Sequence, residues 1–439
     1  MNTADRIADL SMIWKQAAFV FPYFDRLSLD WDKAYVDALP CVMGTENERE
    51  FHLMLAEFMN LLGDGHTDYQ FPRSLLDENG YLPFALRYVD GGYCIEAAAA
   101  EHENMIGASV LKLNGKPFEF LLLACKRYGY HVGDYMPRYR LHQLLPFFLK
   151  PTGNTATTDQ GTFSFDLLKQ KPDKLMSKPL TTDEDYQKID SPKLDIRLYH
   201  DDILYIRLDD FLYAEAANEV REALNSQPNL CSVILDIREN IGGMTMNASR
   251  IAELFISGVF HACKKRTRSM RGLELASASQ ISGWSKEKIE REIANGLLDR
   301  AEAELSRSLL QNAHFDEYED SFGKEGQDAL FHGACVLLTS RNTVSAAEDF
   351  TAMFKSNHRA LIIGTPTSGT TGTPLLQRLR CGGSMRICSV AYRLSDGTEF
   401  IGQGIQPDIE ADLTAADVRE GMDTVLKKAL DCLRKQNEA

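Results

Sequence analysis

Hydrophobic positions near the beginning of the chain recur at helical spacing. One predicted helix face is formed by Phe51, Leu55, Phe58 and Leu62. Residues three and four apart share a face, so this spacing predicts an amphipathic helix. Thr45-Glu46-Asn47-Glu48 fits a capping box at its start, and Gly63-Asp64-Gly65 is typical of a helix end. We therefore predict an N-terminal helical domain over residues 1–72, with His66 directly after its last helix.

The pattern changes to short β-like runs from about residue 78. Strands are predicted over residues 82–89, 92–97, 110–113 and 162–168, and Asn114-Gly115 is a typical tight-turn pair. Residues 171–192 are rich in Thr, Pro, Asp, Lys and Ser, which is typical of a linker. Residues 73–190 are therefore predicted to form a β-rich segment followed by a linker.

Apolar runs alternate with helical patterns from about residue 193. Strands are predicted over residues 203–208, 231–237, 334–339, 359–364 and 384–394, and helices over 214–224, 344–354 and from 414 onward. A continuous apolar run such as 231–237 is typical of a strand buried on both faces. The alternation predicts an α/β domain over residues 191–439, with helices packed on a largely parallel or mixed sheet. The fold class is thus α/β, in an α+β multidomain arrangement.

One polar segment, residues 264–330, interrupts this last domain. It is predicted to be mostly helical, and it is highly charged from Glu287 to Glu325. Two interpretations stand side by side: a solvated insertion, or a lid or oligomer arm near the functional site.

Composition and charge narrow the classes of function. The chain has 439 residues, with 48 basic and 63 acidic side chains and a net charge of −15. A nucleic-acid partner needs a basic patch, and the sequence has no long basic run, so no nucleic-acid partner is expected. No apolar stretch has the length of a membrane span, so no membrane partner is expected. The nine cysteines are scattered, and the N-terminus lacks a signal-peptide pattern, which predicts a cytoplasmic protein. The ten histidines form no His-Glu-x-x-His set, so no metal is expected.

Ser345 lies where a predicted buried strand ends and a helix begins. The N–H groups in the first turn of a helix have no intrahelical partner, and the helix dipole favours negative charge there. A serine in that turn is well placed to act as a nucleophile, and the N–H of Ala346 could donate to an oxyanion. The alternative is that Ser345 is only a polar residue at a helix start.

A glycine pair, Gly242-Gly243, follows the most apolar predicted strand. Adjacent glycines permit unusual backbone angles and close approach of a ligand. Their N–H groups could form the second half of an oxyanion hole, in which each donor contributes a few kcal/mol. The alternative is a turn that serves folding only. A phosphate-binding loop is disfavoured because no Gly-Lys-Ser/Thr follows.

Several motifs, in a fixed order, resemble one family. They are Leu62-Gly63-Asp64-Gly65-His66-Thr67, Asp236-x-Arg-x-Asn-x-Gly-Gly, Thr343-x-Ser-Ala-Ala-Glu, the segment from Leu361 to Gly369, and Gly404-Ile405-Gln406-Pro407-Asp408. Together they resemble the tail-specific, or C-terminal processing, serine peptidases, in the branch of the tricorn protease core and the retinoid-binding relatives. Residues 106–115 resemble the end of a PDZ-type domain. The resemblance implies a PDZ-like β-rich segment and a C-terminal crotonase/ClpP-like α/β catalytic domain with a helical insertion.

The resemblance also implies roles for individual residues. Ser345 matches the nucleophile, and Gly242 or Gly243 matches the oxyanion hole together with the Ala346 amide.

The base differs between branches of the family. One branch uses a lysine, but the corresponding position here is Thr370, which disfavours a Ser–Lys dyad. The tricorn-like branch uses a histidine after the N-terminal helices, and His66 matches that position. Histidine titrates near neutrality, which suits a base that takes the proton of a serine. The alternative is that His66 is a polar residue in a helix-terminal turn.

The acidic member of a triad is displaced in this sequence. The family position for a glutamate is Ile401, and Glu399 lies two residues earlier. Positions two apart in a strand share a face, so Glu399 is the candidate to orient His66; the alternative is a surface residue.

These motifs predict a serine-type peptidase that hydrolyses peptide bonds through an acyl-enzyme, with no metal or organic cofactor. Its partner would be a polypeptide or peptide substrate, and a homo-oligomer remains open. The alternative is a catalytically inactive binding module for apolar ligands or peptides on the same fold.

Overall fold

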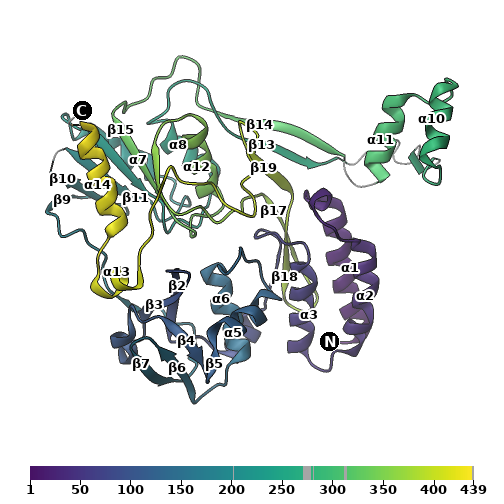
Figure 1. Cartoon of the computed structure of the whole chain (residues 1–439), viewed down its shortest axis with the longest axis horizontal. Helices are drawn as coiled ribbons and strands as arrows, with labels where there is room; N and C mark the ends of the chain where they lie inside the picture. The colour runs from purple at the N-terminus through teal and green to yellow at the C-terminus, as the bar shows by residue number, and fades with distance from the viewer. Residues whose placement is uncertain (201, 270–277, 280, 311–313, 438–439) are drawn as a thin grey trace.

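The computed structural model describes residues 1–200, 202–269, 278–279, 281–310 and 314–437 (Figure 1). Parts of the predicted insertion, residues 270–277, 280 and 311–313, lie outside the described residues. The fold is mixed α/β, with helices and several separate sheets. Across the described ranges, no helix has the length and apolar character needed to cross a bilayer.

Three helices, α1 (Thr3–Val20), α2 (Trp31–Gly44) and α3 (Glu48–Asn60), form the N-terminal part of the chain. Asn47 caps α3, because its side chain accepts from the N–H of Glu50 at 2.9 Å. The predicted cap at Thr45 is wrong: the Thr45 hydroxyl donates back to the carbonyl of Val42 instead.

Residues 73–177 contain two small antiparallel sheets and several helices. Helix α4 (Arg73–Asn79) precedes a sheet of β2 (Phe84–Val89), β3 (Gly92–Ala98) and β8 (Met176–Ser177). The other sheet has the order β5 (Lys116–Pro117), β4 (Val110–Leu113), β6 (Asn154–Thr158), β7 (Gly161–Phe165). Asn114 and Gly115 have φ of 51° and 75°, the positive values that a tight turn of this type requires.

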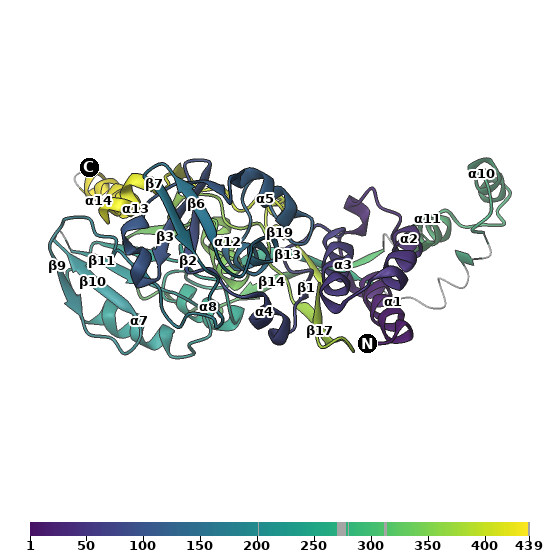
Figure 2. The same cartoon turned by 90° about the horizontal axis from the view of Figure 1, so that it is seen from below.

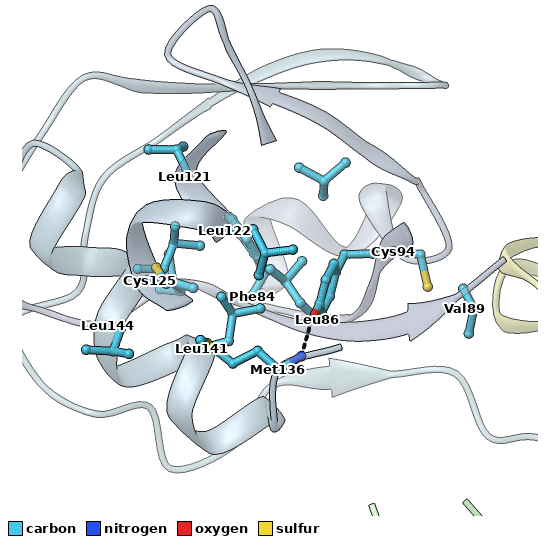
Figure 3. Close-up of a cluster of buried hydrophobic side chains, with 14 of the residues drawn as sticks. Phe84, Leu86, Val89, Cys94, Leu121, Leu122, Cys125, Met136, Leu141 and Leu144 are labelled. Carbon is cyan, nitrogen blue, oxygen red and sulfur yellow. Dashed lines mark hydrogen bonds between the residues drawn. The ribbon is translucent and has the colours of Figure 1, made fainter. Parts of the chain in front are cut away.

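Two helices in this region, α5 (Phe118–Lys126) and α6 (Arg138–Leu144), were not apparent from the sequence pattern. Figure 3 shows their apolar side chains beside those of β2. The buried cluster includes Phe84, Leu86, Leu121, Leu122, Cys125, Leu141 and Leu144. Both helices therefore help to close the hydrophobic core of residues 73–177.

A seven-stranded sheet is the centre of the C-terminal part. Its order is β20 (Ile409–Glu410), β16 (Leu361–Gly364), β15 (Ala334–Thr339), β12 (Ser232–Asp236), β11 (Ile203–Arg207), β10 (Asp195–Tyr199), β9 (Tyr186–Ile189). The strands from β20 to β11 pair in parallel, and β10 and β9 pair antiparallel. This is the mixed sheet that the sequence predicted.

Helices cover both faces of this sheet. Val233, Leu235 and Leu337 pack in one cluster with α7 (Ala216–Asn225), α8 (Thr245–Ala252) and α12 (Ala346–Ser356). Ile234, Val336 and Leu338 point to the opposite face, toward α14 (Thr424–Asn437). Helix α13 (Ala415–Glu420) precedes α14. Because alternate residues of each strand face different helices, the central strands are apolar on both faces.

The segment predicted as a helical insertion is built on a long ribbon. Strands β13 (Phe260–Arg268) and β14 (Phe315–Phe322) pair antiparallel, and β19 (Val390–Leu394) pairs with β13. Helices α10 (Lys286–Ala294) and α11 (Arg300–Leu310) stand at its tip, away from the seven-stranded sheet (Figure 1). The prediction that this segment is mostly helical is therefore correct only for its tip.

Another small sheet joins the N-terminal part of the chain to its C-terminal part. Strand β1 (Asp68–Gln70) pairs with β18 (Ser384–Cys388), which pairs with β17 (Pro374–Arg378). The predicted strand over 384–394 is thus two strands, because the chain leaves β18 at Ser389 and β19 joins another sheet. In Figure 2 the N-terminal helices lie beside this sheet.

Candidate active site

Ser345 stands at the turn between β15 and α12. It occupies the cap position immediately before α12, with φ 62° and ψ −126°; it therefore precedes the first helical turn rather than lying within it. The hydroxyl of Thr343 donates to the carbonyl of Ile237, and the N–H of Val344 donates to the carbonyl of Asn240. These bonds fix the turn against the loop that follows β12. A positive φ at a non-glycine residue is strained, and such strain is concentrated at functional sites.

The glycine pair lies against this turn. A Cβ on Gly242 would come within 2.7 Å of the Ser345 Cβ, so only glycine allows the two loops to approach this closely. The N–H of Gly242 donates to Asn240 Oδ1 at 2.9 Å. The prediction of Gly242 as an oxyanion donor is therefore corrected, because its N–H is already bonded. Within the described part of the chain, the N–H groups of Gly243 and Ala346 have no hydrogen-bond acceptor.

His66 comes to Ser345 from the other end of the chain. Its Nε2 lies 3.1 Å from Ser345 Oγ, and its Nδ1 lies 2.6 Å from Thr370 Oγ1. The loop that carries it is fixed by Asp64, whose carboxylate accepts from the N–H of His66 at 3.1 Å and the hydroxyl of Thr67 at 2.7 Å. The imidazole is thus held between two hydroxyl groups in a buried position.

The small sheet holds this loop against the C-terminal part. The hydroxyl of Thr67 accepts from the N–H of Cys388 at 3.0 Å, and Arg386 donates to the carbonyl of Gly65 at 3.0 Å. Arg386 also pairs with Asp68, which is directly opposite it in β1. Pairing of β1 with β18 therefore positions His66 over Ser345.

Burial strongly affects the titration of His66. Burial and the nearby charge of Arg386 lower the pKa of His66 to about 3, against the opposing effect of Asp68. The imidazole is therefore neutral at physiological pH. A neutral Nε2 can accept the proton of the Ser345 hydroxyl.

Glu399 does not contact His66. Its carboxylate pairs with Arg26 at 2.6 Å and with Arg393, at the protein surface. The prediction that Glu399 orients His66 is wrong, because the strand β19 ends at Leu394 and residues 395–399 turn toward these two arginines.

Two residues near the site were not recognised from the sequence. Thr370 bonds to His66, and the fully buried Glu348 accepts from the N–H groups of Gly369 and Thr370 at 2.8 and 2.7 Å. Burial raises the pKa of Glu348 to about 8, although these donors lower it. Glu348 ends the Thr343-x-Ser-Ala-Ala-Glu motif and Thr370 directly follows the segment from Leu361 to Gly369, but a lone threonine or glutamate carries no sequence signal for this contact.

A cavity of about 470 Å³ lies beside the site. Ile241 and Val344, the neighbours of Gly242 and Ser345, form part of its lining. Three aromatic residues, Tyr81, Tyr135 and Tyr139, also line it. The cavity therefore lies between the Ser345 turn and residues 73–190, and its lining combines these side chains with the charged Arg73, Glu96, Arg138 and Lys171.

In the ranges that the structure describes, no group of three or more His, Cys, Asp or Glu side chains is arranged to hold a metal ion.

Comparison with known proteins gives consistent matches. Residues 202–411 match the sequence model of peptidase family S41. The carboxy-terminal-processing protease of Bartonella bacilliformis is 26% identical over 137 residues, and the match spans 30% of this chain and 32% of that protein's length. The chain shares its fold with mature CPAF, with a TM-score of 0.70 and 15% identity over 95% of this chain and 94% of that one. The photosystem II D1 C-terminal processing protease matches with a TM-score of 0.50 and 16% identity over 93% of each chain.

Proposed function

Because its residues 202–411 belong to peptidase family S41, we propose that this protein is a serine peptidase that cleaves polypeptides or peptides through an acyl-enzyme. The observation that carries the proposal is the approach of Ser345 Oγ to His66 Nε2 at 3.1 Å, between residues 279 positions apart in the chain. A serine hydroxyl is a weak nucleophile until a base takes its proton. This contact supplies that base.

The proposed mechanism uses Ser345 as nucleophile and His66 as base. His66 Nε2 takes the Ser345 proton while Oγ bonds to the carbonyl carbon of the scissile peptide. The N–H groups of Gly243 and Ala346 stabilise the oxyanion, since both have no acceptor in the described part of the chain. His66 then gives its proton to the leaving amine, and the C–N bond breaks. Water, activated by His66, releases the acyl group from Ser345.

The test is covalent labelling of Ser345 by a fluorophosphonate probe. This probe reacts with an activated serine hydroxyl, so the wild-type protein should be labelled at Ser345 and nowhere else. The alternative function, an inactive binding module for apolar ligands or peptides, predicts no labelling. The close contact between Ser345 and His66 favours the peptidase.

The proposal includes a division of the chain into three domains. Residues 1–72 would form the N-terminal helical domain, 73–190 a PDZ-like domain with its linker, and 191–439 a crotonase/ClpP-like catalytic domain with the insertion 264–330. The two small antiparallel sheets of residues 73–177 support the second assignment. Limited proteolysis that cuts first within these ranges, rather than near their boundaries, would count against the division.

Substrate recognition is proposed to use the cavity beside Ser345. The aromatic and aliphatic part of its lining suits large apolar side chains next to the scissile bond. His142, also in its lining, accepts from the N–H of Leu86 at 3.0 Å, and burial lowers its pKa to about 3. The cavity wall is therefore uncharged at this point. The PDZ-like segment is proposed to bind the C-terminus of the substrate as an added strand.

Matched peptides test both parts of substrate recognition. We expect kcat/KM to be at least about 10-fold higher for peptides with Phe or Leu beside the scissile bond than with Ser, because an apolar pocket discriminates by buried area. Ala85→Phe, which narrows the cavity, should reduce this ratio. Ala97→Phe is the control, since Ala97 pairs with Ala85 across the strands but lines a different cavity.

Equal cleavage of peptides with free and amidated C-termini would contradict the proposed role of the PDZ-like segment in binding the C-terminus of the substrate.

The pH dependence should reflect the lowered pKa of His66. The acid limb of kcat/KM reports the pKa of the essential base in the free enzyme. A histidine at its ordinary value would be more than about nine-tenths protonated at pH 5, whereas a pKa of about 3 leaves His66 neutral there. We expect kcat/KM for a fluorogenic peptide to change less than about twofold between pH 7 and pH 5. Half-maximal activity near pH 6.5 would show an unperturbed histidine.

Location and assembly complete the proposal. We propose a cytoplasmic protein, supported by nine cysteines that are all free thiols. Cell fractionation tests the cytoplasmic location.

We also propose that the ribbon of β13 and β14, which carries α10 and α11 away from the sheet, is the arm of a homo-oligomer. Light scattering of the purified protein would show a monomer if the arm is only a solvated insertion.

A further inference from the structure

Thr370 touches three parts of the site at once. Its N–H donates to Glu348 Oε2 at 2.7 Å, its carbonyl accepts from the N–H of Ser345 at 3.0 Å, and its Oγ1 lies 2.6 Å from His66 Nδ1. The side chain is 3% exposed. We infer that Thr370 is the positioning residue that orients His66 toward Ser345, in the place where a carboxylate was expected. This inference rests on the proposed peptidase function.

The direction of the hydrogen bond follows from the chemistry. His66 can accept the Ser345 proton at Nε2 only if the proton of the neutral imidazole is on Nδ1. That Nδ1–H then donates to Thr370 Oγ1. A hydroxyl oxygen can accept this bond, whereas a methyl group in the same place cannot. The proton stays on Nδ1 throughout, so Thr370 takes part in no bond-making step.

Two neighbours leave little freedom to the Thr370 side chain. A Cβ on Gly65 would lie 2.8 Å from Thr370 Cβ, Cγ2 and Oγ1, so the residue before His66 must be glycine for this contact to form. Glu348 accepts from the N–H groups of Gly369 and Thr370. Glu348 lies in the first turn of α12, three residues after Ser345. The same helix start therefore fixes both the nucleophile and the loop that orients the base.

The arrangement differs from a triad in its charge. The hydroxyl of Thr370 carries no charge, and Glu399 is paired with Arg26 and Arg393. Thr370 therefore supplies direction to the imidazole without the electrostatic stabilisation that a carboxylate gives to an imidazolium. This agrees with the lowered pKa of His66 described above.

The test compares Thr370→Val with Thr371→Val. Both replace a buried threonine by its isosteric apolar counterpart, but the Thr371 hydroxyl donates to Asp349 Oδ1 at 2.9 Å and not to His66. We expect Thr370→Val to lower kcat about 10²-fold at unchanged KM, because a misdirected base costs about that factor. Thr371→Val should stay close to wild type. Thr370→Ser, which restores the acceptor, should recover activity to within about threefold of wild type.

Other outcomes would overturn the assignment. A positioning role would be excluded if Thr370→Val and Thr371→Val were equally active. It would also be excluded if Thr370→Ser were as inactive as Thr370→Val, or if Thr370→Val changed KM alone. Fluorophosphonate labelling distinguishes failure of the Thr370 assignment from failure of the proposed peptidase function. In the Thr370→Val variant, the probe should label Ser345 slowly but completely. A wild-type protein that neither cleaves peptides nor labels would overturn the peptidase proposal, and the role of Thr370 with it.

Discussion

Ser345→Ala is expected to abolish cleavage of casein by this protein, with a loss in kcat on the order of 10⁶-fold, as for removal of a serine nucleophile elsewhere. The Ser345 hydroxyl is the group that His66 Nε2 contacts at 3.1 Å. Alanine keeps the backbone bonds of the turn, including the donation from the N–H of residue 345 to Thr370. The loss should therefore appear in catalysis and in fluorophosphonate labelling, with circular dichroism unchanged.

Two further serine variants sharpen this test. Ser368→Ala is the matched control, because Ser368 is buried nearby and its hydroxyl has no hydrogen-bond partner among the described residues, so full activity is expected. Ser345→Gly should be inactive yet more stable than Ser345→Ala by about 1 kcal/mol, since glycine adopts a positive φ without strain. Casein cleavage that survives in Ser345→Ala would refute Ser345 as the nucleophile.

Asp68→Ala is expected to lower the free energy of unfolding by about 3–5 kcal/mol, the cost of breaking a buried ion pair. Asp68 accepts from Arg386 at 2.7 and 3.0 Å and from Arg140, which is 1% exposed. Removing the carboxylate leaves the Arg140 charge buried without its acidic partner. Urea unfolding followed by the fluorescence of Trp14 and Trp31, which lie in the N-terminal helices α1 and α2, measures the change.

The pH dependence of this effect has a definite sign. Burial raises the pKa of Asp68, but Arg140 and Arg386 outweigh it and hold the pKa below its ordinary value of 3.8. The stabilisation is therefore present above that ordinary value and is lost as the pH falls toward the folded-state pKa. The difference between wild type and Asp68→Ala should be largest near neutrality and shrink in acid.

Control variants separate the buried pair from a general loss of charge. Asp37→Ala removes the partner of Lys33 in an exposed pair and should leave the unfolding curve unchanged. Asp68→Leu combined with Arg140→Met replaces both buried charges and should recover part of the stability. An Asp68→Ala protein as stable as wild type would show that the pair contributes nothing to folding.

Local features of the fold were accessible to sequence reasoning. The run from Cys231 to Ile237 is apolar at both strand faces, so it predicted a central buried strand, and β12 is buried throughout. The Asn114-Gly115 turn was equally clear, because its positive φ values demand these residue types. Helices α5 and α6 were not apparent, because short segments in a β-rich context owe their helical state to packing in the shared hydrophobic core rather than to their own pattern.

The sequence by itself determined which residues are candidates for the chemistry. Ser345, His66 and the glycine pair stand in short motifs whose backbone requirements are local, such as the positive φ of Gly242 and Gly243. It did not determine which partner orients His66. The contact between His66 and Thr370 joins residues 304 positions apart, and it depends on the pairing of β1 with β18 and on the missing side chain of Gly65. Only the tertiary structure decides such a contact, because a hydrogen bond tolerates errors of a few tenths of an ångström and chain spacing carries no information at that scale.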